Sequence, residues 1–258
     1  MAELPSQDAA RLTLQSLARL SKGVQIGLEQ GFNSWAYVDY IYANRAFGTT
    51  PFGALVDRLF LSHPACAALR SRCALTAQQV QLAVESFSRP TVVDLAAGTA
   101  PYLFALPRGQ GEFIAGDVDP AAVKQGNQLA GERGRDDIRF IELNAFNRRS
   151  LPDCTADVVV TSGFFGFLPE PAVRRVFHAC SGLTRAGSRW VFNVQHQHPG
   201  LLEGPAESPL RALLGFFTNP SDLKSAEKVA GWAAEFGWSL ERSASNDYFS
   251  VASLVRER

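Results

Sequence analysis

The sequence predicts a doubly wound α/β sandwich, in which a mostly parallel sheet is covered by helices and preceded by a helical segment. Three observations predict this fold. Short β-branched runs alternate with helix-like segments after residue 88. The first of these runs ends in a tight turn of small residues, and the last two runs follow each other with no helix between them. Alternating strands and helices of this length are typical of βαβ units.

The N-terminal third shows helical spacing of its apolar residues. We expect one or two amphipathic helices before the break at 31–33, another over Trp35–Ala46, further helical turns after Thr50, and a long helix from about Cys66 to Phe87. No convincing strand precedes residue 88. The prediction is therefore a helical cap or lid over residues 1–87 and an α/β domain over residues 88–258.

The second part of the chain carries the strand and helix pattern. Five strands are expected over 91–96, 112–117, 138–143, 156–161 and 188–194, with helices over 121–133 and 169–183. Two further strand-like runs flank residues 243–247. With no helix between them, these two runs predict an antiparallel hairpin at the edge of the sheet.

Composition excludes several classes of protein. The 258 residues carry 25 basic and 25 acidic side chains, so neither nucleic acid nor an anionic membrane is an expected partner. Apolar runs stay below the roughly 18 residues of a membrane span, and the polar start lacks a signal-peptide pattern. Four scattered cysteines favour reduced thiols. We expect a cytoplasmic protein; its oligomeric state is open.

The most informative stretch is VVDLAAGTAPYLFAL. A buried strand ends at Asp94, small residues follow around Gly98, and Pro101 is placed to open a helix. Small residues let the backbone approach a ligand, and a helix N-terminus offers free N–H groups. Nineteen residues after Gly98 the next strand ends at Asp117, whose carboxylate can accept hydrogen bonds from both ribose hydroxyls. The order predicts a nucleoside site.

The turn argues against a dinucleotide. It supplies one glycine where a pyrophosphate-binding turn has three, and the preceding Asp94 would repel a pyrophosphate. S-adenosylmethionine carries a sulfonium and an ammonium, which suit a carboxylate at that position.

In this order and spacing the chain resembles the class I S-adenosylmethionine-dependent methyltransferases over residues 88–258. The family's cofactor loop, D-x-x-x-G, matches Asp94 and Gly98, although Ala100-Pro101 stands where many members have another glycine. The resemblance implies a Rossmann-like sandwich with a closing antiparallel hairpin, S-adenosylmethionine as co-substrate and Asn144 near the adenine. It implies these cofactor-binding residues: Asp94, Ala96, Ala97, Gly98, Thr99, Asp117, Val118, Asn144, Ala145, Phe146 and Ser162.

A narrower resemblance rests on DLAAG, NAFNRRSL, SGFFGFLPEP, NVQHQHP and the upstream YANRAFG. These segments are similar to a bacterial methyltransferase group of undefined chemistry, some members of which are fused to hydrolase domains. The chain also resembles, in its expected fold, the azetidine-2-carboxylate synthases of natural-product pathways. The first hypothesis is methyl transfer to a small-molecule acceptor in specialised metabolism. The second is cyclisation of the cofactor's aminobutyl arm with release of methylthioadenosine, and the third is a non-catalytic nucleoside-binding regulator.

Aromatic side chains are candidates for the second substrate's pocket. Phe164 and Phe165 follow the fourth strand, and Trp35 belongs to an N-terminal aromatic cluster. Each set has two interpretations: packing in the core, or an aromatic wall that attracts a sulfonium. Gln195, after the fifth strand, would orient the substrate or end the strand.

Four side chains are candidates for catalysis. Tyr37 and Tyr40 would close over the site if the N-terminal helices form a lid, and would pack if they do not. His196 and His198 follow the fifth strand, where a neutral imidazole could take a proton from an acceptor O–H or N–H. A structural role for His198, stacking before Pro199, is the alternative. Without a nearby carboxylate or cysteine, this pair does not favour a metal, and none is expected.

Overall fold

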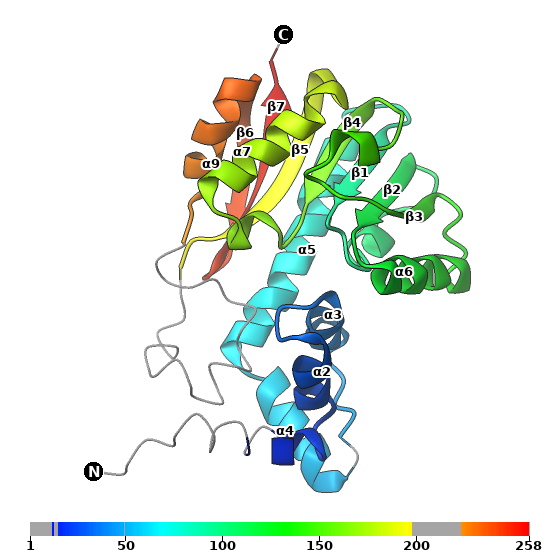
Figure 1. The fold of residues 1–258 in the computed structure, drawn as a ribbon, viewed down its shortest axis with the longest axis vertical. Helices are drawn as coiled ribbons and strands as arrows, with labels where there is room; N and C mark the ends of the chain where they lie inside the picture. The colour runs from blue at the N-terminus through cyan, green and yellow to red at the C-terminus, as the bar shows by residue number, and fades with distance from the viewer. Residues whose placement is uncertain (1–11, 13–14, 49, 198–222, 258) are drawn as a thin grey trace. The chain divides into compact units, whose positions relative to one another are not determined.

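A computed structural model describes residues 12, 15–48, 50–197 and 223–257 of the chain (Figure 1). These residues form two compact units, and the chain passes from the first to the second between Arg70 and Ser71. That point lies inside α5 (Pro64–Val84), whereas the sequence suggests a boundary after residue 87. The difference arises because the second half of α5 packs with the sheet: Val80 and Val84 belong to the same buried cluster as Val92.

The described part of the first unit includes three short helices and the first turns of α5. These helices are α2 (Lys22–Gln30), α3 (Trp35–Ala43) and α4 (Pro51–Leu61). Each begins after a hydroxyl side chain that accepts a hydrogen bond from a first-turn N–H, namely Ser21, Ser34 and Thr50. α3 ends three residues earlier than the predicted Ala46, because Asn44 adopts a left-handed conformation (φ 49°).

A buried carboxylate joins the helices of the first unit. Asp57 on α4 is fully buried and accepts a hydrogen bond from the Ser21 hydroxyl. Its second oxygen accepts the backbone N–H groups of Lys22 (3.3 Å) and Phe47 (3.2 Å). One side chain therefore fixes the start of α2, the helix α4 and the loop before α4.

The second unit is built on a seven-stranded sheet. Its order is β3-β2-β1-β4-β5-β7-β6, and only the pairs that involve β7 are antiparallel. The strands are β1 (Thr91–Leu95), β2 (Glu112–Asp117), β3 (Ile138–Glu142), β4 (Ala156–Thr161), β5 (Thr184–Gln195), β6 (Trp238–Ser245) and β7 (Phe249–Arg256). This arrangement confirms the predicted mostly parallel sheet with a C-terminal antiparallel hairpin.

Alternate residues of the strands fill two separate cores. Val92 and Val158 face the second half of α5, on the side that also carries α6 (Pro120–Glu132). Val93 and Val159 face the opposite side, which α7 (Glu170–Ala179) and α9 (Ala226–Ala233) cover (Figure 1). Helices therefore cover both faces, as a doubly wound sheet requires.

The predicted helix after Pro101 is absent. The segment forms only the short 3-10 turn η1 (Leu103–Ala105). Ala100 before it is left-handed (φ 44°), and Leu106 after it is extended because Pro107 follows. The expectation of a ligand at this helix N-terminus is therefore wrong, and the loop must bind through its own backbone and side chains.

Candidate functional site

The carboxyl ends of β1 to β5 lie at one edge of the sheet, because these five strands run parallel. The loops that follow them hold most of the predicted site residues, and those loops converge at this edge. β1 and β4 are neighbours there, with Asp94 opposite Val160. The edge therefore brings the predicted cofactor residues of four loops together.

Asp94 is a fully buried carboxyl group at the end of β1. One of its oxygens accepts a hydrogen bond from the hydroxyl of Tyr102, and Oδ1 has no hydrogen-bond partner among the described residues. The pKa of Asp94 is raised from 3.8 to about 8: burial is the main cause, the Tyr102 hydrogen bond lowers the pKa, and the nearby Asp117 contributes a smaller increase. A cation at Oδ1 would satisfy this oxygen and favour the charged form.

The turn after β1 is tied to the end of β2. The N–H of Gly98 donates to Oδ2 of Asp117 (2.8 Å), and the N–H of Asp119 donates to Oδ1 (3.0 Å). Ala97 N–H donates to the carbonyl of Gly116 (3.0 Å). Because each oxygen of a carboxylate has more than one acceptor site, Asp117 can still accept two ligand hydroxyls.

The same turn holds two alanines in an unfavourable backbone conformation. Ala96 (φ 55°) and Ala100 (φ 44°) are left-handed, as is Gly98 (φ 56°) between them. A left-handed alanine costs about 1–2 kcal/mol relative to its ordinary conformation. Strain of this kind concentrates where a backbone must approach a ligand.

The loops after β2 and β3 provide an apolar surface and a polar rim. Val118 follows Asp117 directly and is 66% exposed, so its side chain can cover a flat ring. Asn144 is exposed, and its side-chain oxygen accepts the N–H of Phe146 (2.9 Å). Ala145 between them is buried. These contacts suit a nucleobase beside Val118 with Asn144 at its edge.

The two phenylalanines predicted for the substrate pocket lie in different surroundings. Phe164 is partly buried, and its ring lies 5.7 Å from that of Phe146. Phe165 is fully buried against Phe177 (5.4 Å) and Phe192 (5.8 Å). Packing accounts for Phe165, whereas Phe164 can still serve as a pocket wall.

Asn193 fixes the turn after β4 and is a residue that the sequence analysis missed. Its amide oxygen accepts the N–H of Gly163 (2.8 Å), and its amide nitrogen donates to Ser162 Oγ (2.8 Å) and Thr76 Oγ1 (3.2 Å). The signal was an asparagine within the apolar run 190–194. This side chain joins β5, the turn and α5.

Gln195 is the last residue of β5, and His196 follows it at the same edge of the sheet. Gln195 is buried and donates to the carbonyl of Gln197 (3.0 Å). His196 is partly exposed, and its Nδ1 lies 2.9 Å from the hydroxyl of Ser250 on β7. The contact orients the ring, so Nε2 is the nitrogen that could exchange a proton with a substrate. His198 lies outside the described residues.

The three aromatic candidates of the cap belong to the first unit. Tyr37 is fully buried between Phe32 (5.2 Å) and Phe60 (6.0 Å). Tyr40 is buried, and burial together with the neighbouring Asp57 raises its pKa. Trp35 is partly buried. This packing supports the structural interpretation of the tyrosines, and the lid role of all three stays a prediction.

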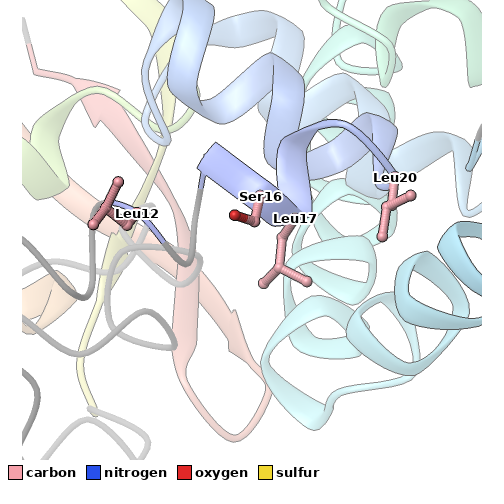
Figure 2. Close-up of a pocket in the computed structure, with 4 residues that line it drawn as sticks. All are labelled: Leu12, Ser16, Leu17 and Leu20. Atoms are coloured by element: carbon pink, nitrogen blue, oxygen red, sulfur yellow. The ribbon is translucent and has the colours of Figure 1, made fainter.

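The first unit also carries a shallow hollow of about 360 Å³, lined by Leu12, Ser16, Leu17 and Leu20 (Figure 2). Three leucines and one hydroxyl offer no acid, base or charge for the predicted chemistry. Among the described residues no cluster of three potential metal ligands occurs, and no helix is long and apolar enough to cross a membrane. The expectation that no metal takes part stays a prediction.

Comparison with known proteins identifies the family. Residues 5–204, well over half of the chain, match the model of the family described as "Putative methyltransferase". The chain belongs to this methyltransferase family. The protein YnbC of Escherichia coli K12, which is uncharacterized, is 28% identical over 194 residues, or 70% of this chain and 33% of YnbC. The chain thus spans about one third of that relative.

Solved structures show the same fold. A Bordetella parapertussis protein described as a possible exported protein superposes with a TM-score of 0.61, 16% identity and full coverage of both chains. A SAM-dependent methyltransferase of Aquifex aeolicus superposes with a TM-score of 0.53 and 18% identity, and the match covers 72% of this chain and 93% of that one. An O-methyltransferase family protein of Burkholderia thailandensis superposes with a TM-score of 0.53 and 19% identity, and the match covers 91% of this chain and 71% of that one. Family and fold place the chain in the class I S-adenosylmethionine-dependent methyltransferase superfamily.

The sheet edge of this methyltransferase fits S-adenosylmethionine. Asp94 presents a buried oxygen without a partner among the described residues, which suits the cationic methionine end. Asp117 suits the ribose, and the exposed Val118 with Asn144 suits the adenine. Tyr102, which the sequence analysis did not select, adds the donor that orients Asp94.

Proposed function

We propose that this methyltransferase transfers the methyl group of S-adenosylmethionine to a small-molecule acceptor in specialised metabolism. The observation that carries the proposal is the carboxylate of Asp117, held by the N–H groups of Gly98 and Asp119 beside the exposed Val118. A fixed carboxylate at the end of the second strand, next to an apolar side chain, matches a ribose with its base.

The chain's own residues would bind and orient the co-substrate. Asp117 accepts from the two ribose hydroxyls, and Val118 covers one face of the adenine. Asp94 places negative charge beside the ammonium and sulfonium groups, and its burial strengthens the attraction. When bound, S-adenosylmethionine supplies a methyl carbon attached to a positively charged sulfur.

Phe164 and His196 would act on the acceptor side. The partly exposed ring of Phe164 limits the access of water and favours a cation next to it. His196, oriented through its Nδ1 by Ser250, would accept a proton at Nε2 from an acceptor O–H. An amine acceptor that is already neutral would need no such base, so proximity and orientation would then supply most of the rate.

The first test is calorimetric titration of the protein with S-adenosylhomocysteine. Asp117→Ala should weaken binding by about ten- to a hundredfold, because a charged acceptor is lost to the ribose hydroxyls. Asp153→Ala removes the same charge from an exposed position before β4 and should leave the affinity unchanged. Equal affinity in wild type and Asp117→Ala would contradict the assignment.

The second test separates the alternative reactions by incubating the protein with S-adenosylmethionine alone and analysing products by mass spectrometry. Binding with unchanged co-substrate supports transfer to an external acceptor. Methylthioadenosine with an equimolar four-carbon imino acid would instead establish the cyclase. Failure of wild-type protein to bind S-adenosylmethionine or S-adenosylhomocysteine would contradict both reactions and leave the third hypothesis, a non-catalytic regulator that binds a different nucleoside.

A further inference from the structure

The surroundings of Asp94 do little to stabilise a negative charge. Its neighbours in the sheet are Ala115 on β2 and Val160 on β4, two fully buried apolar residues. The Tyr102 hydroxyl donates to one of its oxygens, and the other oxygen, Oδ1, has no hydrogen-bond partner among the described residues. An ionised carboxyl group that is removed from water needs a cation or several donors, and the described residues give this one a single hydroxyl.

A second carboxyl group opposes the ionisation of Asp94. Asp117, at the end of β2, accepts the N–H groups of Gly98 and Asp119 and places a negative charge nearby. Among the described residues, the titratable groups that act on Asp94 are this carboxylate and Tyr102 from the loop after β1, while β4 offers the apolar Val160. Burial, with a smaller contribution from Asp117, therefore raises the pKa of Asp94, and the Tyr102 hydrogen bond lowers it only in part.

The amino-acid end of S-adenosylmethionine would change this balance. It carries an ammonium group beside the sulfonium, and S-adenosylhomocysteine keeps the ammonium group. A cation at Oδ1 of Asp94 would fill the position that lacks a partner and offset the loss of water around the carboxylate. A nucleoside without the amino-acid end, such as 5′-methylthioadenosine, offers no such cation.

We propose that Asp94 is protonated in the unliganded protein and that binding of S-adenosylmethionine or S-adenosylhomocysteine releases this proton to water. The inference rests on the proposed function, because it concerns the same co-substrate site. The proton and the cationic end of the co-substrate compete for one carboxyl group. Affinity therefore falls as the pH falls, by up to about tenfold for each pH unit below the pKa of the unliganded group. The turn after β1 thus makes occupancy of the co-substrate site sensitive to pH.

The first measurement is calorimetric titration of the full chain with S-adenosylhomocysteine at pH 6, in buffers that differ in heat of ionisation. The dependence of the binding heat on the buffer gives the number of protons released, which should be about one for each bound nucleoside. The affinity should rise about tenfold or more between pH 6 and pH 7.5. 5′-Methylthioadenosine should bind without proton release, and its affinity should change by less than about twofold over this range.

Asp94→Asn identifies the group that releases the proton, because asparagine keeps the shape of the side chain and does not titrate. In this variant the proton release should disappear, and the affinity for S-adenosylhomocysteine should change by less than about twofold between the two pH values. Asp153→Asn makes the same change at an exposed position and should keep the wild-type proton release and pH dependence. Binding of 5′-methylthioadenosine by each variant shows that the nucleoside site is folded.

Three results would overturn the inference. The first is binding of S-adenosylhomocysteine by wild type without proton release. The second is an equal proton release with 5′-methylthioadenosine, and the third is a release that survives in Asp94→Asn. If Asp94→Asn does not fold, Tyr102→Phe decides: loss of its hydrogen bond raises the pKa of Asp94 and should move the rise in affinity to higher pH, so an unchanged pH profile would contradict the inference.

Failure of the proposed function gives a different result. Wild-type protein that binds neither nucleoside at either pH contradicts the proposed function and, with it, this inference. Binding of S-adenosylhomocysteine without proton release contradicts the inference alone and leaves the co-substrate assignment in place.

Discussion

Asp94→Asn should make the unliganded protein more stable at neutral pH, although it removes a residue of the proposed co-substrate site. Asp94 is fully buried, and its pKa is raised from 3.8 to about 8. The folded protein therefore retains a proton on this group at pH values where the unfolded chain has released it. Stability must then fall as the pH rises from about 4 to about 8.

The size of the effect follows from the pKa difference. Each unit corresponds to about 1.4 kcal/mol, so at pH 7 Asp94 lowers the free energy of unfolding by about 4 kcal/mol. Between pH 6 and pH 9 the free energy of unfolding should fall by a further amount of about 3 kcal/mol on account of Asp94. The decrease ends once the folded protein has also released the proton. Asparagine keeps the shape and an acceptor for Tyr102, but it does not titrate.

Urea unfolding of wild type and Asp94→Asn at pH 6 and pH 9 measures this directly, since other titrating groups cancel in the difference. The advantage of Asp94→Asn should grow by about 3 kcal/mol over this range. Tyr102→Phe is the companion variant: it removes the hydrogen bond that lowers the Asp94 pKa, so the pH dependence should extend to higher pH. A difference that is independent of pH would refute the reasoning.

Three further predictions concern backbone strain and packing. Ala96→Gly should raise the free energy of unfolding by about 1 kcal/mol, because glycine tolerates the left-handed conformation. A lower stability of the variant in calorimetric unfolding would contradict the proposed strain at Ala96. Phe165→Ala should cost about 3–5 kcal/mol in urea unfolding, and Phe164→Ala clearly less, since only Phe165 is fully buried. Asp57→Ala should cost about 3 kcal/mol by leaving buried donors without an acceptor, so an unchanged melting temperature would contradict its joining role.

The sequence predicts the central strands β1, β2 and β4 well because most of their residues are apolar and buried. β2 and β4 have the predicted bounds, since buried parallel strands admit few polar residues along their length. β5 begins four residues earlier than predicted, at Thr184. Its first residues include Arg185 and Gly187, which are not typical of a strand. Regular pairing with β4 runs from Arg189 onward, after an irregularity that follows Thr184.

The residue pattern of the sequence did not predict which side chains form hydrogen bonds with each other. Tyr102 and Asn193 act through hydrogen bonds to residues that are separated from them along the chain, and a single sequence does not show which separated residues meet in space. The packing of the second half of α5 on the sheet was also not visible in the sequence. This packing explains why the observed boundary between the two units lies within that helix.

The missing helix after Pro101 coincides with a part of the second unit that costs stability. Ala96 and Ala100 are strained there, and Asp94 holds a carboxyl group away from water. A regular helix would have relieved the strain at Ala100, but it would also have replaced the backbone path that brings Gly98 to Asp117. Local sequence rules fail where a structure gives up stability for binding, so this turn, more than the well-predicted strands, marks the position of the proposed ligand.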